Sequence, residues 1–251
     1  MSFLRGWRRR RLRARPFPRR WQPFLSGIPL LPFLAPSDQR ELLGHIQVFL
    51  AEKRFEGAAR FTVDERVRLT VAGNACLLLL RRKTDYFPRL RTVVVYPTLY
   101  VARYRRPGPG GVVEEGMEVR AGESWPLGTV VLAWDAVLEA GFGPGARNVV
   151  VHEFAHQLDL EDGAMQGVPV LPAELREPWQ SVFFGEYLRL RASPKPTPLA
   201  WGLESPAEFF AVATELFFAD PWSLRAHHPE LYGLLSRYFG WDPAELVRIG
   251  G

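Results

Sequence analysis

The sequence predicts an α+β domain in which helices support a small group of strands. Two segments, residues 38–53 and 64–82, place apolar side chains at helical spacing. Three further runs, at residues 91–95, 99–103 and 128–134, are rich in β-branched and aromatic residues, as strands usually are. We therefore expect a layer of two helices followed by a core that contains the strands.

Local signals refine the ends of these elements. Ser37 or Asp38 is a suitable N-cap for the first helix, and Asp64 is a suitable opening residue for the second. Residues 105–122 are rich in Gly, Pro and Glu and are expected to form a mobile surface loop. A further helix is expected at residues 178–190.

Composition indicates a globular protein with an unusual start. Apolar residues make up 47% and aromatic residues 13% of the 251 residues. The net charge is +5, but residues 1–20 contain nine arginines and no acidic residue, which leaves −4 for the remainder. Such a basic arm is usually a solvated tail, although it is also a surface that nucleic acid or anionic lipid could bind. We expect direct binding of nucleic acid to be the weaker interpretation.

The segment after the arm is apolar but unsuited to a membrane. Residues 24–36 contain three prolines and are far shorter than the roughly 20 residues that a spanning helix needs. We expect residues 1–36 to form a basic arm and a Pro-rich extended segment, and residues 37–251 to form a single domain. Within that domain, residues 37–90 form the helical layer and residues 91–251 the core. Because Cys76 is the only cysteine, no internal disulfide is possible, and a cytoplasmic location is expected.

One motif predicts chemistry. Residues 149–159 read VVVHEFAHQLD, which contains the pattern H-E-x-x-H. On a helix, His152 and His156 lie on one face and can bind the same zinc ion. Glu153 is then placed to act as a general base on a water that the zinc makes more acidic. The alternative is a buried helix whose two histidines and one glutamate are hydrogen-bonded core groups.

The strand predicted at residues 128–134 precedes this motif, as in zinc-peptidase catalytic domains. The exposed edge of such a strand can pair with an extended peptide substrate. The alternative interpretation is an ordinary core strand, and the sequence does not separate the two.

A third zinc ligand is expected, because catalytic zinc usually has three protein ligands and one open position. The other histidines, which are His45, His227 and His228, show no informative spacing. Asp162 stands six residues after His156, where one known class places its third ligand. That class has Gly at the position that Asp159 occupies here, which disfavours Asp162.

Two glutamates on another predicted helix, residues 206–218, are stronger candidates. Glu208 and Glu215 are seven residues apart and project from nearly the same face of an otherwise apolar helix. Glu208 can also be the third helical residue of a capping box that begins at Ser205. Glu215 can instead hydrogen-bond a ligating histidine, a role that is also open to Asp159.

The chain resembles a known family, the Mlc titration factor A family (the DgsA anti-repressors) of bacterial zinc metallopeptidases. The resemblance extends over most of the chain and consists of several separate blocks in the same order. The blocks are ARPFP at residues 14–18, ACLLLL at 75–80, TVVVYP at 92–97, GTVVLAW at 128–134, NVVVHEFAHQLDLEDG at 148–163, SPAEFFAVATELFF at 205–218 and HPELYGLL at 228–235.

The resemblance implies a zincin-like fold with a mixed sheet. It implies that His152, His156 and Glu208 bind Zn²⁺ and that Glu153 is catalytic. It also implies a cytosolic peptidase with aminopeptidase character, acting on a peptide or protein substrate. The family name further implies an alternative role, in which the protein sequesters a transcriptional repressor of the Mlc type and has weak or no catalytic activity.

The chain departs from the family at Trp201. Family members commonly have a tyrosine there, seven residues before the third ligand, which is thought to stabilise the oxyanion. An indole N–H donates one hydrogen bond but cannot transfer a proton as a phenol can. Loss of such a donor costs on the order of 10²–10³ in rate. Tyr187 and Tyr232 are possible substitutes, although the sequence does not favour either.

Overall fold

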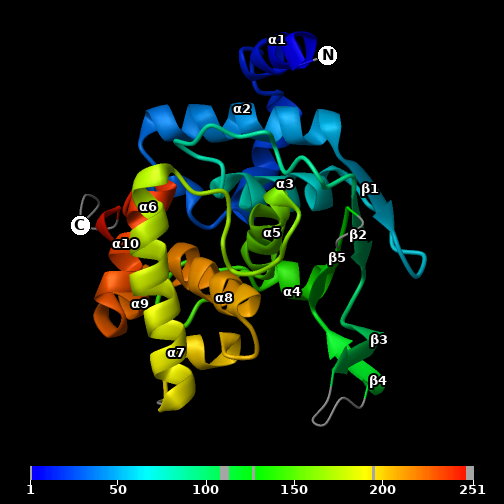
Figure 1. The fold of residues 1–251 in the computed structure, drawn as a ribbon. Coiled ribbons are helices and arrows are strands. Elements are labelled where there is room, and N and C mark those ends of the chain that lie inside the picture. Colours follow the sequence, from blue (N-terminus) through cyan, green and yellow to red (C-terminus); the bar gives the residue numbers. More distant parts are fainter. Residues whose placement is uncertain (1, 108–112, 126–127, 194–195, 247–251) are drawn as a thin grey trace.

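The computed structural model describes residues 2–107, 113–125, 128–193 and 196–246. Its helices are α1 (Ser2–Arg13), α2 (Pro36–Glu52), α3 (Glu65–Leu77), α4 (Trp134–Leu138), α5 (Val149–Asp159), α6 (Ala173–Pro178), α7 (Gly185–Ala192), α8 (Pro206–Ala219), α9 (Pro221–His227) and α10 (Pro229–Phe239). Its strands are β1 (Arg54–Gly57), β2 (Thr92–Tyr96), β3 (Tyr100–Pro107), β4 (Val113–Arg120), β5 (Gly122–Trp125) and β6 (Thr129–Ala133). Figure 1 shows the strands on one side, the C-terminal helices on the other and α5 between them.

A four-stranded mixed sheet has the order β1-β2-β6-β5. The first three strands are parallel, and β5 is antiparallel to β6. Val93 and Val95 of β2 are buried, in register with Val130 and Leu132 of β6. The mixed sheet expected from the sequence is confirmed. Because β6 lies inside the sheet and β5 is the edge, the strand at residues 128–134 is an interior strand.

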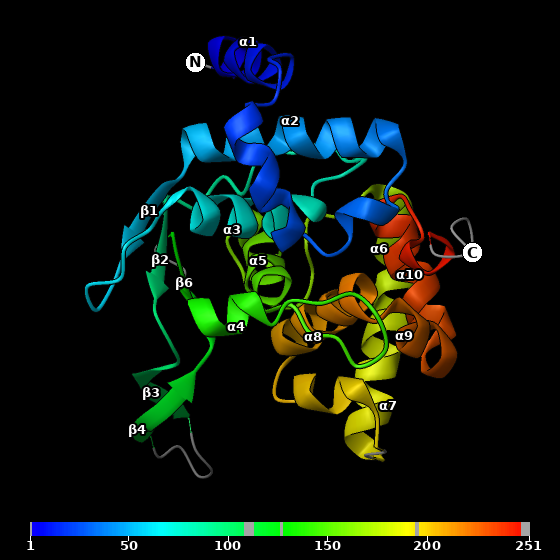
Figure 2. The same ribbon diagram turned by 180° about the vertical axis from the view of Figure 1, so that it is seen from behind.

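A two-stranded hairpin of β3 and β4 extends from the sheet (Figures 1 and 2). The surface loop predicted at residues 105–122 is therefore wrong for residues 105–107, which end β3, for residues 113–120, which form β4, and for Gly122, which begins β5. Glu and Gly are poor strand formers alone, but pairing with β3 supplies the backbone partners of β4. Residues 108–112 of the predicted loop lie outside the described residues.

Apart from Pro36, helices α2 and α3 lie within residues 37–90, where the sequence analysis expects a helical layer. Strand β1 lies in the same range and pairs with β2, and α3 ends at Leu77, before the predicted end at residue 82. Asp64 caps α3 as expected, since its side chain accepts a hydrogen bond from Val67 N at 2.9 Å. Helix α2 begins earlier than predicted, with Ala35 at the N-cap position and Pro36 in the first turn. The Asp38 side chain is not a cap but pairs with Arg81 at 2.6 Å.

The N-terminal segment is helical, so the extended conformation predicted for it is wrong. The arginine-rich start forms α1, and two 3-10 helices follow at Arg19–Gly27 and Leu31–Phe33. The φ angle that proline imposes suits these short turns. Ile28 and Leu30, in the link between the two 3-10 helices, are buried in the core.

The C-terminal helices share an aromatic core. The helix predicted at residues 178–190 is part of a longer helical run from Ala173 to Ala192, and its middle turn, Trp179–Phe184, is π-helical. Trp179 and Phe183 are fully buried and pack against Phe210 of α8. No helix in the described part of the chain combines the length and apolar character needed to cross a membrane.

Candidate metal centre

Helix α5 carries the H-E-x-x-H residues, and its start is held by Asn148. The Asn148 side chain accepts a hydrogen bond from Val151 N at 3.2 Å, as an N-cap does. Its amide group donates to Asn74 Oδ1 of α3 at 2.8 Å. Farther along α5, Phe154 packs on Phe87 with ring centroids 4.9 Å apart. These contacts fix the face on which His152 and His156 lie.

Helix α8 brings the third side chain. Ser205 accepts a hydrogen bond from Glu208 N at 3.1 Å, and Pro206 occupies the first helical position. The backbone half of the predicted capping box is therefore present. The Glu208 carboxylate is directed elsewhere, because it contacts the two imidazoles of α5.

The three side chains converge. Glu208 Oε1 lies 3.2 Å from His156 Nε2, and Glu208 Oε2 lies 3.4 Å from His152 Nε2. One ligand atom from each of the three residues lies within 4.8 Å of the others. Two imidazole nitrogens and a carboxylate oxygen are the donor set of many divalent-metal sites with an open position. The residues therefore fit a divalent metal ion.

Glu215 contacts His152 at the ring nitrogen opposite the one that lies near Glu208. Its Oε2 lies 3.3 Å from His152 Nδ1, and its Oε1 accepts a hydrogen bond from Asn148 N at 2.8 Å. A carboxylate at Nδ1 selects the tautomer in which Nε2 is free to bind a metal. Spacing had indicated that Glu208 and Glu215 face the same way, and the two carboxylates contact opposite nitrogens of one ring.

The site contains several shifted pKa values. Burial alone would lower the pKa of His152, but its hydrogen bonds to Glu208 and Glu215 raise that pKa to about 10. Burial would raise the pKa of Glu208, yet the two histidines hold it well below its usual range. The surrounding carboxylates therefore favour a positive charge at this position, and a cation is the species that this negative environment would accept.

Glu153 lies beside the cluster under β5. Its side chain is buried, and this burial raises the pKa of the carboxyl group. Gly122, the first residue of β5, makes room for it: a Cβ there would lie 2.5 Å from Glu153 Oε1. The sequence analysis did not identify Gly122, since only the packing of β5 on α5 reveals its role.

The cluster opens onto a cleft of about 710 Å³. Elements β4 and β5 form one wall, and α4, α5 and α8 form the other. Seven glutamates and two arginines are among the described residues that line it. The cleft is thus strongly acidic.

The remaining carboxylate candidates lie outside the cluster. Asp162 accepts a hydrogen bond from Ala164 N at 3.0 Å and is not among the three grouped ligands. Asp159 accepts hydrogen bonds from Gly167 N at 2.7 Å and Val168 N at 2.8 Å, so it anchors the loop after α5. The buried His156 Nδ1 has no hydrogen-bond partner within the described chain, so Asp159 does not support it.

The aromatic candidates also lie elsewhere. Trp201 is 76% exposed and is not among the residues that line the cleft. The Tyr187 hydroxyl accepts a hydrogen bond from Arg191, and the Tyr232 hydroxyl donates one to Asp242. Sequence reasoning missed Tyr100, whose buried hydroxyl has no hydrogen-bond partner among the described residues. Burial and the charges of Glu123 and Glu153 raise the pKa of Tyr100.

Residues 4–240 match the family described as glucose-regulated metallo-peptidase M90. The chain belongs to this family. An uncharacterized protein of Synechocystis sp. is similar to this chain, with 40% identity over 94% of this chain and 89% of the relative. Proteins named Mlc titration factor A from Salmonella agona and Salmonella gallinarum are each 27% identical over 91% of this chain and 88% of their own length. The resemblance stated from the sequence is confirmed. Membership of the M90 family implies a divalent metal, and the group of His152, His156 and Glu208 is the candidate site for it.

Proposed function

We propose that the protein is a zinc-dependent peptidase that hydrolyses peptide bonds in the cytoplasm. The observation that carries this proposal is the convergence of His152, His156 and Glu208 at the base of an open cleft. Membership of a metallopeptidase family supports the same reaction class.

The positions of the residues support the roles that we propose for them. His152, His156 and Glu208 would hold the metal, and Glu215 would keep the Nε2 of His152 available. When bound, zinc supplies a Lewis acid that polarises the scissile carbonyl and makes water more acidic. Glu153 accepts the proton from the attacking water and returns it to the leaving amine. Its raised pKa suits both steps, because a carboxyl group titrating nearer to neutral pH can accept and release a proton.

The charge of the cleft favours a peptide substrate that has a free amino group. Its many carboxylates attract a cationic α-amine, which is consistent with aminopeptidase-like action. Strand β5 forms the edge of the sheet and lines the cleft, so its backbone is available to an extended peptide. Trp201 would not supply the oxyanion donor, since its side chain faces solvent.

Metal content and hydrolysis of a pool of fluorogenic peptides test this proposal together. We expect about one zinc per chain in the wild type and in Glu153→Gln, with hydrolysis lost only in the latter. Glu208→Ala should lose both the zinc and the activity. A Glu153→Gln protein that keeps zinc and hydrolyses as fast as wild type would overturn the catalytic role of Glu153.

A second candidate function is the capture of a transcriptional repressor. The observation that favours it is the similarity to proteins named Mlc titration factor A. Binding of a purified Mlc-type repressor to the wild type and to Glu153→Gln separates the two functions. Equal binding by both proteins would establish capture without catalysis, and no binding by either would exclude this role.

A further inference from the structure

Helix α1 lies at one end of the molecule, beyond α2. Figures 1 and 2 show it on the far side of the α2–α3 layer from the cleft elements β5 and α8. The metallopeptidase site therefore makes no use of this helix. Its sequence, SFLRGWRRRRLR, combines arginines with large apolar residues.

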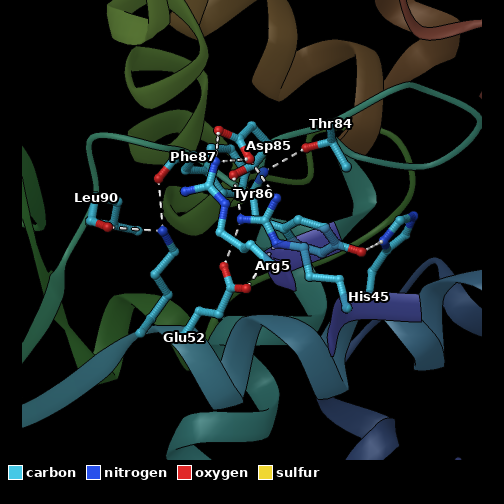
Figure 3. Close-up of polar contacts among 10 residues, drawn as sticks. Arg5, His45, Glu52, Thr84, Asp85, Tyr86, Phe87 and Leu90 are labelled. Atoms are coloured by element: carbon cyan, nitrogen blue, oxygen red, sulfur yellow. Dashed lines mark hydrogen bonds and ion pairs between the residues drawn. The ribbon is translucent and has the colours of Figure 1, made fainter. Parts of the chain in front are cut away.

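Arginines on the inner face of α1 bind this helix to the rest of the protein. Arg9 pairs with Glu52 at 2.7 Å and also with Asp85, and its guanidinium lies 4.7 Å from the Tyr86 ring centroid. Arg5 pairs with Asp85 at 2.7 Å. Figure 3 shows Arg5, Glu52 and Asp85 side by side in this cluster. These contacts hold α1 in a fixed orientation on α2.

The outer face of α1 combines exposed apolar side chains with arginines that have no carboxylate partner among the described residues. Leu4, Trp7, Arg8 and Arg11 follow the spacing i, i+3, i+4, i+7 and lie on one face. Leu4 is 73% and Trp7 53% exposed, and the Arg11 guanidinium lies 5.5 Å from the Trp7 ring centroid. Arg8 and Arg11 are exposed, and no carboxylate of the described residues pairs with either.

Arginines of this kind also lie outside the outer face of α1. Further exposed arginines without a carboxylate partner in the described part of the chain are Arg10, Arg13, Arg15 and Arg19. One end of the molecule therefore carries a concentrated positive charge that the protein itself does not neutralise, around two solvent-facing apolar side chains.

We propose that this outer face of α1 binds the surface of an anionic phospholipid bilayer. Arginine guanidinium groups pair with headgroup phosphates, and Trp7 and Leu4 enter the boundary between headgroups and acyl chains, where tryptophan is enriched. A nucleic acid would need the arginines only. The exposed Leu4 and Trp7 on the same face therefore favour the bilayer. The protein would bind at the surface, with its cleft directed away from the lipid.

Co-sedimentation of the full-length protein with vesicles tests this proposal. We expect binding to phosphatidylcholine vesicles that contain phosphatidylglycerol, little binding to phosphatidylcholine alone, and weaker binding as salt increases. Each arginine near an anionic surface contributes about a fivefold gain in affinity, so Arg8→Gln/Arg11→Gln should weaken binding by about 25-fold. The charge-matched control, Arg54→Gln/Arg176→Gln, replaces two exposed arginines on other elements and should bind as the wild type does.

A second measurement addresses insertion. Brominated acyl chains should quench part of the wild-type tryptophan fluorescence, and Trp7→Phe should lose that part. Absence of binding to phosphatidylglycerol vesicles, or equal weakening in the control variant, would overturn the proposal. Binding to a DNA duplex or an RNA strand with the same variant dependence, but not to vesicles, would overturn it in favour of a nucleic-acid surface. Vesicle binding without Trp7 quenching would overturn the insertion of the apolar residues.

Discussion

Two charged clusters in this protein differ in how their charges are balanced. Beneath α1, the two carboxylates Glu52 and Asp85 meet Arg5 and Arg9, and the nearby Lys53 donates to the backbone carbonyls of Phe87 and Leu90. Every one of these charged groups has a partner from the chain. Figure 3 shows the cluster as a closed set of contacts between α1, α2 and the segment around Asp85.

The cluster between α5 and α8 is not closed in this way. Three carboxylates, Glu153, Glu208 and Glu215, lie around the two imidazoles of α5. Ligand atoms of His152, His156 and Glu208 converge at the base of the cleft. Among the described residues that pair with these three carboxylates, only Arg147, 3.7 Å from Glu215, adds a permanent positive charge. A buried group of charges that the chain neutralises by itself indicates a structural role, whereas a group in which carboxylates outnumber the permanent positive charges indicates a site for a cationic ligand.

The largest effect should come from opening the closed cluster. Glu52→Gln removes the carboxylate from an ion pair whose side chains are only 12% and 14% exposed. Because this leaves Arg9 less well neutralised, we expect the free energy of unfolding to fall by about 3 kcal/mol. Urea unfolding measures this loss, and Glu56→Gln, at an exposed position of β1, is the matched control. Unchanged stability in Glu52→Gln would show that the two clusters do not differ as described.

A second change tests how tightly the candidate site is packed. Gly122→Ala places a methyl group against the Glu153 carboxylate and should displace it. We expect peptide hydrolysis to fall on the order of 10²-fold while zinc content stays at the wild-type level. Gly185→Ala is the control, because a Cβ there meets no atom within 4 Å. Loss of zinc together with activity would assign Gly122 to the metal site as a whole.

A third change tests the support of His152. Glu215→Gln keeps the shape of the side chain but removes the charge at His152 Nδ1. We expect zinc affinity to fall by about 10- to 100-fold, measured by competition with a chelator. Glu177→Gln, at an exposed site, should bind zinc as the wild type does. A complete loss of zinc would instead indicate that Glu215 is itself a ligand.

The smallest effect concerns pH and the closed cluster. Burial lowers the pKa of Lys53 to about 8, below the 10.5 of a free lysine. Between these values the unfolded chain binds more protons than the folded protein, so the free energy of unfolding should rise with pH. The gain from pH 8 to pH 9 is about 1 kcal/mol relative to Lys53→Met. Urea titrations of both proteins at each pH measure this gain. An identical pH dependence of the two proteins would contradict the lowered pKa of Lys53.

Much of the helical framework could be predicted because its signals are local. Asp64 and Ser205 cap their helices through contacts within one turn, and the spacing of His152 and His156 places both on one face. Spacing also showed that Glu208 and Glu215 project together. It could not assign their roles, because these depend on how α8 packs against α5.

The elements that were missed depend on contacts distant in sequence. Strand β4 exists through its pairing with β3, and the 3-10 helices near the N-terminus are held by burial of Ile28 and Leu30. The role of Gly122 depends on its close contact with Glu153. The Tyr100 hydroxyl, which has no hydrogen-bond partner among the described residues, can be identified only from the folded chain. The local sequence pattern and the composition do not identify such contacts.

The position of β5 also has a consequence for direction. This strand runs from Gly122 to Trp125, antiparallel to β6, and ends the order of its sheet. A peptide paired antiparallel with its outer edge, the slightly more stable arrangement, would run from Trp125 towards Gly122. The carboxyl end of such a peptide would lie near Glu153, whereas a peptide paired parallel with β5 would place its α-amine there, as aminopeptidase-like action requires. The edge would therefore determine which end of a peptide enters first, before any side-chain pocket discriminates between sequences.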